Sequence, residues 1–446
     1  MKKLLILTLA MCLLATASFA TYTRVKTLGE ANMIVPDEHN IWLFPSTIND
    51  YPELFLGEFT TNYAFYLDKE NGYYYNYSFG PGYIPNLGYI SPYYDGYTNL
   101  GTHLKFGEDN PFVLGVYFTE SRAFTPVDFI HPYSGGTYDW EYWLEMDWDD
   151  LSDFDYALMK NQRIDLFYGR NLGENKFGFH FGWVKSGWDE SWDEGEDSYN
   201  PKEGINMFNL GLGLGMMENK LDLGLDFKML SWTDEDSDGE KETESDGSMA
   251  LTLSGRYFNE MNQKCTLVPH GQIMYEKLGV KYPQDEEKAS FTEMAIDLGV
   301  GLHYVPASGI LAVTDFGLIY NTEKVKFEET AEGGEEVEFK LNAMTLPYFK
   351  VGLEATIFDW FDLRMGGVNY WMWDKWDLGD GPGWENWEYK ESYVYTEFYL
   401  GGGFHWGNLF IDAYANPQIL TDGLYFINGH DTEPFAYQVS LKYKMF

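Results

Sequence analysis

Cysteine is nearly absent from this chain of 446 residues, which contains only Cys12 and Cys265. The first twenty residues carry two lysines, an apolar run and small residues at positions 18 and 20, a pattern typical of a cleaved secretory signal peptide. Cleavage would remove Cys12 and leave a mature chain that begins at Thr21. We therefore expect one cysteine in the mature protein and no intrachain disulfide.

Long hydrophobic runs are also missing. Beyond the signal peptide no apolar stretch reaches the ~18 residues that a membrane-spanning helix needs, and the mean hydropathy is −0.35. Yet 18% of the residues are aromatic and 46 are glycine. A transmembrane β-barrel hides its apolar residues in alternation with polar ones, so any membrane role of this chain is expected to come from strands.

Cations are scarce, because 30 Lys and Arg face 70 Asp and Glu and give a net charge of −40. Such an excess argues against nucleic acid and anionic surfaces as partners and favours an affinity for cations.

The clearest pattern present is a hairpin at residues 205–230. Side chains of a strand alternate between two faces, and here one face is apolar while the other holds glycine and polar residues on both sides of a turn at 217–220. The apolar positions are Phe208, Leu210, Leu212, Leu214 and Met216, then Leu221, Leu223, Leu225, Phe227 and Met229.

Similar units recur along the chain, and seven hairpins plus a first and a last strand give about 16 strands. The fold class predicted is all-β: a transmembrane antiparallel up-and-down β-barrel, with 14 strands as the alternative, because Pro269 and Pro347 interrupt two strands. Short turns are expected in the periplasm and long acidic loops outside the cell. The predicted domains are a signal peptide at 1–20, a periplasmic or plug segment at 21–52 and an outer-membrane barrel at 53–446.

Three segments resemble a known family. The hairpin at 398–412, FYLGGGFHWGNLFID, and the segments VGLE at 351–354 and DWFDLR at 359–364 are similar to long-chain fatty-acid transporter-like outer-membrane barrels, and the final Phe446 resembles the end of outer-membrane proteins such as porins. The resemblance implies a barrel of fourteen strands, hydrophobic cargo and a plug that includes Asn-Pro-Ala before the first strand. This chain has Phe44-Pro45-Ser46 there instead.

Charged residues of both signs fall on the polar faces of the predicted strands, as expected for the wall of a water-filled or plugged pore. The predicted pore-lining residues are Arg163, Asp165, Asp222, Asp226, Lys228, Arg256, Glu293, Asp297, Lys350, Glu354 and Arg364. Five histidines also fall on inward positions near the short turns, where contact with a plug is favoured over a metal site: His103, His180, His270, His303 and His405. No nucleophile or acid–base motif stands out, so the chain is not expected to be an enzyme.

The predicted loops interleave tryptophan with carboxylates. Aromatic faces can stack on sugars or cations while carboxylates accept their hydrogen bonds, although an interfacial aromatic girdle would look the same. The candidate loop-binding residues are Trp140, Trp143, Trp148, Trp188, Trp192, Trp373, Trp376, Trp384 and Trp387. In a further acidic loop, Asp234, Asp236 and Asp238 match the opening of a calcium loop, but Ser245 stands where the closing glutamate belongs. Weak Ca²⁺ binding is the only cofactor expected.

These patterns favour a porin-like outer-membrane channel for passive uptake of small, preferably cationic solutes. The alternatives are a plugged transporter of hydrophobic molecules or a structural, adhesive surface barrel. Expected partners are outer-membrane lipid, lipopolysaccharide, the barrel assembly machinery and the solutes themselves; the sequence indicates no oligomeric state.

Overall fold

The computed structural model describes residues 22–63, 82–84, 88–90, 98–108, 111–123, 159–189, 192–194, 197–199, 202–235, 239–283, 287–329, 336–378, 387–415 and 435–445. Three short helices come first: α2 (Tyr22–Thr27), η1 (Glu38–Trp42) and η2 (Pro45–Asp50). The signal peptide predicted at 1–20 lies outside the described residues. No helix among the described residues is long and apolar enough to cross a membrane.

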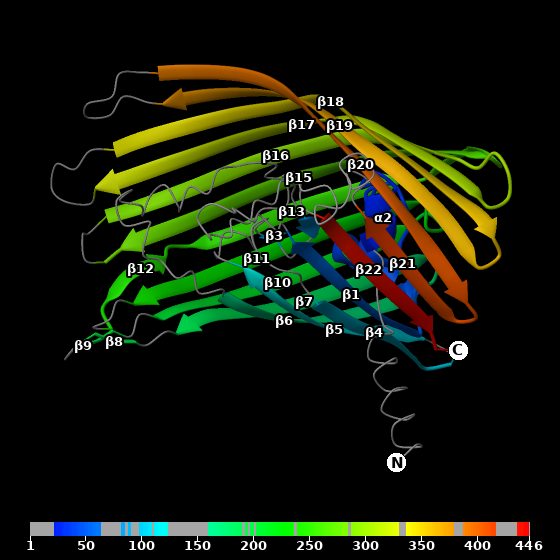
Figure 1. Cartoon of the computed structure of the whole chain (residues 1–446), viewed down its shortest axis with the longest axis horizontal. Helices are drawn as coiled ribbons and strands as arrows, with labels where there is room; N and C mark the ends of the chain where they lie inside the picture. The colour runs from blue at the N-terminus through cyan, green and yellow to red at the C-terminus, as the bar shows by residue number, and fades with distance from the viewer. Residues whose placement is uncertain are drawn as a thin grey trace, which may run out of the picture.

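One antiparallel sheet makes up most of the molecule (Figure 1). Its strands are β1 (Leu54–Tyr63), β4 (Thr98–Phe106), β5 (Phe112–Ala123), β6 (Met159–Leu172), β7 (Asn175–Asp189), β10 (Lys202–Met216), β11 (Leu221–Glu235), β12 (Lys241–Ser245), β13 (Ser248–Tyr257), β14 (Asn259–Asn262), β15 (Cys265–Tyr282), β16 (Glu287–Tyr304), β17 (Ile310–Glu329), β18 (Glu336–Phe358), β19 (Phe361–Leu378), β20 (Trp387–Trp406), β21 (Leu409–Ala415) and β22 (Phe435–Lys444).

The sheet closes on itself because β1 pairs with β4 on one side and with β22 on the other. Of its 18 elements, β12, β13 and β14 follow one another along a single path between β11 and β15, so they count as one strand and the barrel has 16. The predicted transmembrane barrel of 16 strands is confirmed, and every predicted hairpin is present. Residues 217–219 of the central hairpin have φ of 55°, 56° and 69°, the left-handed conformation of its tight turn.

The two faces of the wall differ as the alternation predicts. On β10, Leu210, Leu212 and Leu214 are 42–44% exposed on the outside, whereas Asn209 on the inner face is 1% exposed. An outward apolar face with polar groups turned inward satisfies a bilayer, where no water is present to bind exposed polar groups.

Both prolines fit into their strands without breaking the barrel. Pro269 lies between the end of the β13 pairing at His270 and the start of the β14 pairing at Leu267, so no ladder bond is lost on that side. Pro347 lies at a register shift between Thr345 and Tyr348. The 14-strand alternative, which rested on these prolines, is wrong.

Several segments predicted as loops form strands. Trp371 and Trp373 belong to β19, and residues 387–393 belong to β20. The acidic segment at 233–248 contains β12, and two small hairpins form from β2 (Gly82–Ile84) with β3 (Gly88–Ile90) and from β8 (Trp192–Glu194) with β9 (Asp197–Tyr199). The sequence prediction ended these strands too early because it took clusters of tryptophan and charge as loop signals, whereas tryptophan also favours strands.

Candidate functional site: the lumen

The N-terminal segment, residues 22–52, lies inside the barrel, where Figure 1 shows α2 enclosed by the strands. Val25, Leu28, Ile34 and Ile41 have no solvent exposure. The segment occupies the half of the lumen nearer the short turns, which we call the turn-side lumen; the half nearer the long connections is the loop-side lumen.

Glycines on the inner wall provide the seat for η2. Gly169, Gly178, Gly213 and Gly224 are paired in register on four successive strands, β6, β7, β10 and β11. A Cβ at Gly213 would lie 2.3 Å from the backbone nitrogen of Ser46, and one at Gly224 would lie 1.9 Å from the carbonyl oxygen of Leu43. Any side chain in this row would occupy the space of the N-terminal segment.

An aromatic cluster holds Trp42 beside the glycine row. Its ring lies edge-on to Tyr117, Phe167 and His180, with centroids 5.3, 4.9 and 5.4 Å away. The guanidinium of Arg163 lies 5.2 Å from the Trp42 ring centroid, within the range of a cation–π interaction. Arg163 also donates to Asp165 at 2.7 Å, and His180 lies 2.8 Å from the same carboxylate.

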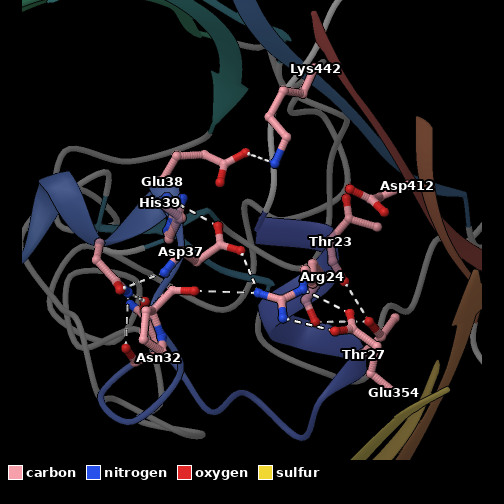
Figure 2. A network of polar contacts seen from close by, with 12 residues as sticks. Thr23, Arg24, Thr27, Asn32, Asp37, Glu38, His39, Glu354, Asp412 and Lys442 are labelled. Atoms are coloured by element: carbon pink, nitrogen blue, oxygen red, sulfur yellow. Dashed lines mark hydrogen bonds and ion pairs between the residues drawn. The ribbon is translucent and has the colours of Figure 1, made fainter. Parts of the chain in front are cut away.

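Ion pairs connect helix α2 to the barrel wall (Figure 2). Arg24 donates twice to Glu354 on β18, at 2.8 and 2.9 Å, and once to Asp37 at 3.1 Å. Arg364 on β19 donates to the same Glu354 at 2.6 Å, so one wall carboxylate receives two guanidinium groups. Bidentate pairs of this kind fix orientation as well as adding energy.

A second charged contact holds η1. Lys442 on β22 pairs with Glu38, while Asp37 caps the helix by accepting from the backbone nitrogen of His39 at 3.1 Å. Burial lowers the pKa of His39 to about 4, against the opposing pull of Asp37. Burial raises the pKa of Glu38, although Lys442 acts in the other direction. His39 is therefore neutral at neutral pH.

The predicted pore-lining residues all lie on the inner face. Nine are buried: Arg163, Asp165, Asp222, Asp226, Lys228, Arg256, Glu293, Asp297 and Arg364; Lys350 and Glu354 are half-buried. Arg256 donates to Asp222 at 2.9 Å and reaches the carbonyl oxygen of Asn32, and Lys350 reaches that of Glu30 at 3.4 Å. Several of these residues therefore contact the N-terminal segment, and their role in lining a pore stays a prediction.

Three of the five histidines touch the N-terminal segment, as expected. His103 donates to the carbonyl oxygen of Tyr51 at 2.6 Å, and His303 donates to that of Ile34 at 2.8 Å, while His180 packs on Trp42. The other two, His270 and His405, pair with Asp315 and Asp362 of the wall. Within the described ranges, no group of three His, Cys, Asp or Glu could hold a metal ion.

The loop-side lumen has a different wall. A buried apolar band crosses it, made of Val184, Met207, Leu230, Trp232, Ala250, Leu278, Val280 and Ala289. The row next to this band, one step nearer the short turns, contains Glu276, Glu293 and Glu323. They lie directly opposite one another on β15, β16 and β17. These glutamates are 0–3% exposed. Like charges at opposed positions are unfavourable by themselves, so this row is unusual.

Of the candidate loop-binding tryptophans, the five within the described residues lie in strands. Trp373 lies on the outer face of β19 with 40% exposure, which fits a girdle better than a binding loop. Trp188, Trp192, Trp376 and Trp387 lie in strands, and Trp140, Trp143, Trp148 and Trp384 fall outside the described residues. Asp234 lies in β11, and Asp236 and Asp238 are outside the described ranges. Glu244 pairs with Lys241 and Lys281. The calcium site therefore stays a prediction.

Sequence reasoning missed the glycine row and Trp42. Glycines at every second position of residues 211–215 and at Gly178 and Gly224 were an available signal, since glycine inside a strand often marks close approach of another backbone.

No protein-family model and no curated protein matches this chain. Solved structures with a similar fold include a mutant of the ferric enterobactin receptor from Pseudomonas aeruginosa (10% identity, 88% of this chain and 80% of that chain, TM-score 0.32) and the siderophore receptor PirA from Acinetobacter baumannii (9%, 88% and 80%, 0.32). CdiB from Escherichia coli is another (9%, 88% and 63%, 0.39). At these identities and TM-scores the likeness carries no argument about this chain. The resemblance to fatty-acid transporters stays a prediction.

Proposed function

We propose that this chain is an outer-membrane transporter that takes up small cationic solutes through a lumen restricted by its N-terminal segment. The long connections would face the exterior and the short turns the periplasm. One observation carries the proposal: among the buried side chains of the described strands, twelve are Asp or Glu and five are Lys or Arg. A narrow lumen with this imbalance favours cations and repels anions.

The restriction by residues 22–52 bears on how transport occurs. Their seat is built by backbone contact with the glycine row and by ion pairs, so an open, porin-like pore requires that the segment leave part of the cross-section free or move. We infer a low resting conductance for this reason.

A planar-bilayer measurement tests the proposal. With a KCl gradient the reversal potential should have the sign of cation preference, and the preference should decline between 0.1 M and 1 M salt as the screening length falls from ~10 Å to ~3 Å. Anion preference would overturn the proposal.

The apolar band favours a second candidate, a transporter of hydrophobic molecules. Its eight buried side chains span six neighbouring strands of the lumen, which an aqueous channel does not require. A protein that passes no ions in bilayers but restores growth on a hydrophobic carbon source would favour this candidate over the first.

A further inference from the structure

The inner face of β20 presents four tyrosines and two glutamates in a continuous row. Side chains at odd positions point into the lumen, since Tyr399 is 2% exposed and contacts the N-terminal segment, whereas Val394 and Phe398 on the other face are 59% and 63% exposed. The inward series is Tyr389, Glu391, Tyr393, Tyr395, Glu397 and Tyr399. Inward positions on a strand recur about every 6.6–6.8 Å, so the series rises roughly 33 Å along the wall. We call this series the β20 track.

The hydroxyl groups of the track hold its carboxylates in place. Tyr395 and Tyr399 donate to Glu397 at 2.6 and 2.8 Å, and Tyr389 donates to Glu391 at 2.9 Å. The hydroxyls are thus used within the wall, which leaves ring faces and carboxylate lone pairs as the groups offered to a ligand. Ring faces and carboxylates both attract organic cations.

The track position nearest the short turns, Tyr399, already holds an ammonium group. Lys26 of α2 places its Nζ 5.5 Å from the ring centroid of Tyr399 and 5.6 Å from that of Tyr414, with Glu30 Oε1 3.7 Å away. Burial acts to lower the pKa of Lys26, but Tyr414, Glu397 and Glu30 hold the pKa raised. The chain itself therefore shows which group these rings and carboxylates accept.

The neighbouring strand β19 repeats the arrangement nearer the long connections. Tyr370 on β19 is paired with Tyr395, and their ring centroids are 6.2 Å apart. Lys350 places its Nζ 5.9 Å from the Tyr370 ring centroid, so this ring also already holds an ammonium group. Asp374 is paired with Glu391 and accepts a hydrogen bond from Tyr393. Its Oδ1 is buried and has no hydrogen-bond partner among the described residues. In the same described part of the chain, no lysine or arginine lies over Tyr393 or Tyr395.

From this geometry we infer that the β20 track is a binding site for a linear organic polycation. Its ammonium groups would lie beside Tyr393 and Glu391, as the ammonium group of Lys26 lies beside Tyr399. The inference deepens the proposed function, on which it rests, by naming the class of cation. A chain of ammonium groups separated by methylenes matches carboxylates that are separated by aromatic faces, whereas a compact metal ion would use the carboxylates alone.

Titration calorimetry with spermine on the full-length protein in detergent tests the inference. Tyr393→Leu removes a ring face and Glu391→Gln removes a charge, and each should raise the Kd for spermine roughly three- to tenfold. Glu388→Gln is the matched control, because Glu388 lies on the outer face between Lys375 and Lys390; its Kd should stay within about twofold of wild type. Heat-modifiability on gels confirms that each variant is folded.

Equal Kd values for the inward and outward variants would overturn the inference. The KCl reversal potential, measured on the same proteins, separates this failure from that of the proposed function. If the protein prefers cations but its Kd for spermine is unchanged by the Tyr393 and Glu391 substitutions, the proposed function is supported and the β20 track is not a polycation site. Anion preference defeats the proposed function, and the spermine titration then still decides whether the track binds polycations.

Discussion

The turn-side and loop-side halves of the lumen differ in how their charges are used. In the turn-side lumen, Glu354, Asp222 and Asp165 each have an arginine of the chain beside them. In the loop-side lumen, acidic residues lie beside tyrosines, as Glu391 does on the β20 track. The first arrangement holds a segment in place, and the second presents carboxylates beside aromatic rings to the lumen.

The difference also shows in shape. The glycine row brings the wall to within contact of backbone atoms at 43–46, whereas the loop-side wall carries large side chains such as Met207, Trp232 and the tyrosines of β20. The glycines allow close packing of the N-terminal segment, whereas the large side chains form a surface that can contact a ligand. This contrast is open to three tests.

The largest effect is expected from a wedge in the turn-side lumen. Gly213→Leu would place a Cβ 2.3 Å from the Ser46 backbone, and a backbone cannot yield as a flexible side chain can, so the cost should exceed the ~1–3 kcal/mol of ordinary overpacking. Displacement of η2 should then raise the single-channel conductance in planar bilayers. Gly204→Leu on the same strand is the control, because nothing lies within 4 Å of its Cβ position. Equal conductance in both variants would mean that the glycine row does not seat a restriction.

A smaller effect is expected from the charged contacts of α2. Arg24→Met leaves Glu354 with one guanidinium in place of two, and breaking a buried pair costs about 3–5 kcal/mol. Because Arg24 is 19% exposed, we expect the lower end of that range or slightly less. Thr23→Cys, at a position with no solvent exposure and in a Cys265→Ser background, should react with maleimide faster once Arg24 is replaced.

The matched control for Arg24 is Lys281→Met. Lys281 pairs with Glu244 at 2.8 Å but its side chain is 44% exposed, and exposed ion pairs contribute little to stability, so docking of α2 should be nearly unchanged. Labelling at position 23 should be unchanged. If Arg24→Met also left the labelling rate unchanged, charge would not hold α2 against the wall.

The sequence predicted the barrel well because alternation is a local signal. Leu212 and Gly213 reveal their faces from a single strand, and a hairpin is complete within about thirty residues, as at 205–230. Strand ends were less predictable. Trp373 and Tyr393 lie in strands because the long strands continue past their alternating apolar segments. No local sequence signal marks where such a strand ends.

The contacts inside the lumen were predictable only as residue types. Arg364 and Glu354 could be assigned to the inner face, but their partner Arg24 is 330 residues from Glu354 in sequence, and nothing local indicates that pairing. The β20 track was legible in principle, since Tyr389, Glu391, Tyr393, Tyr395, Glu397 and Tyr399 occupy every second position. It was missed because residues up to Tyr393 were predicted to form a loop, so only the part of the track from Tyr395 onward fell in a predicted strand.

The smallest effect concerns pH and His39. Burial lowers the pKa of His39 to about 4, compared with an ordinary value near 6.5 when the segment is undocked. The undocked form then binds a proton more readily, so docking is strongest above about pH 6.5 and weakens as pH falls towards 4. Between pH 6.5 and 5 the loss should be on the order of 2 kcal/mol, at ~1.4 kcal/mol per pH unit. Wild-type open probability in bilayers should therefore rise on acidification, and His39→Gln should rise less. Because the raised pKa of Glu38 favours docking at low pH in both proteins, the difference between the two profiles isolates the imidazole. Identical profiles would show that protonation of His39 does not control docking of the N-terminal segment.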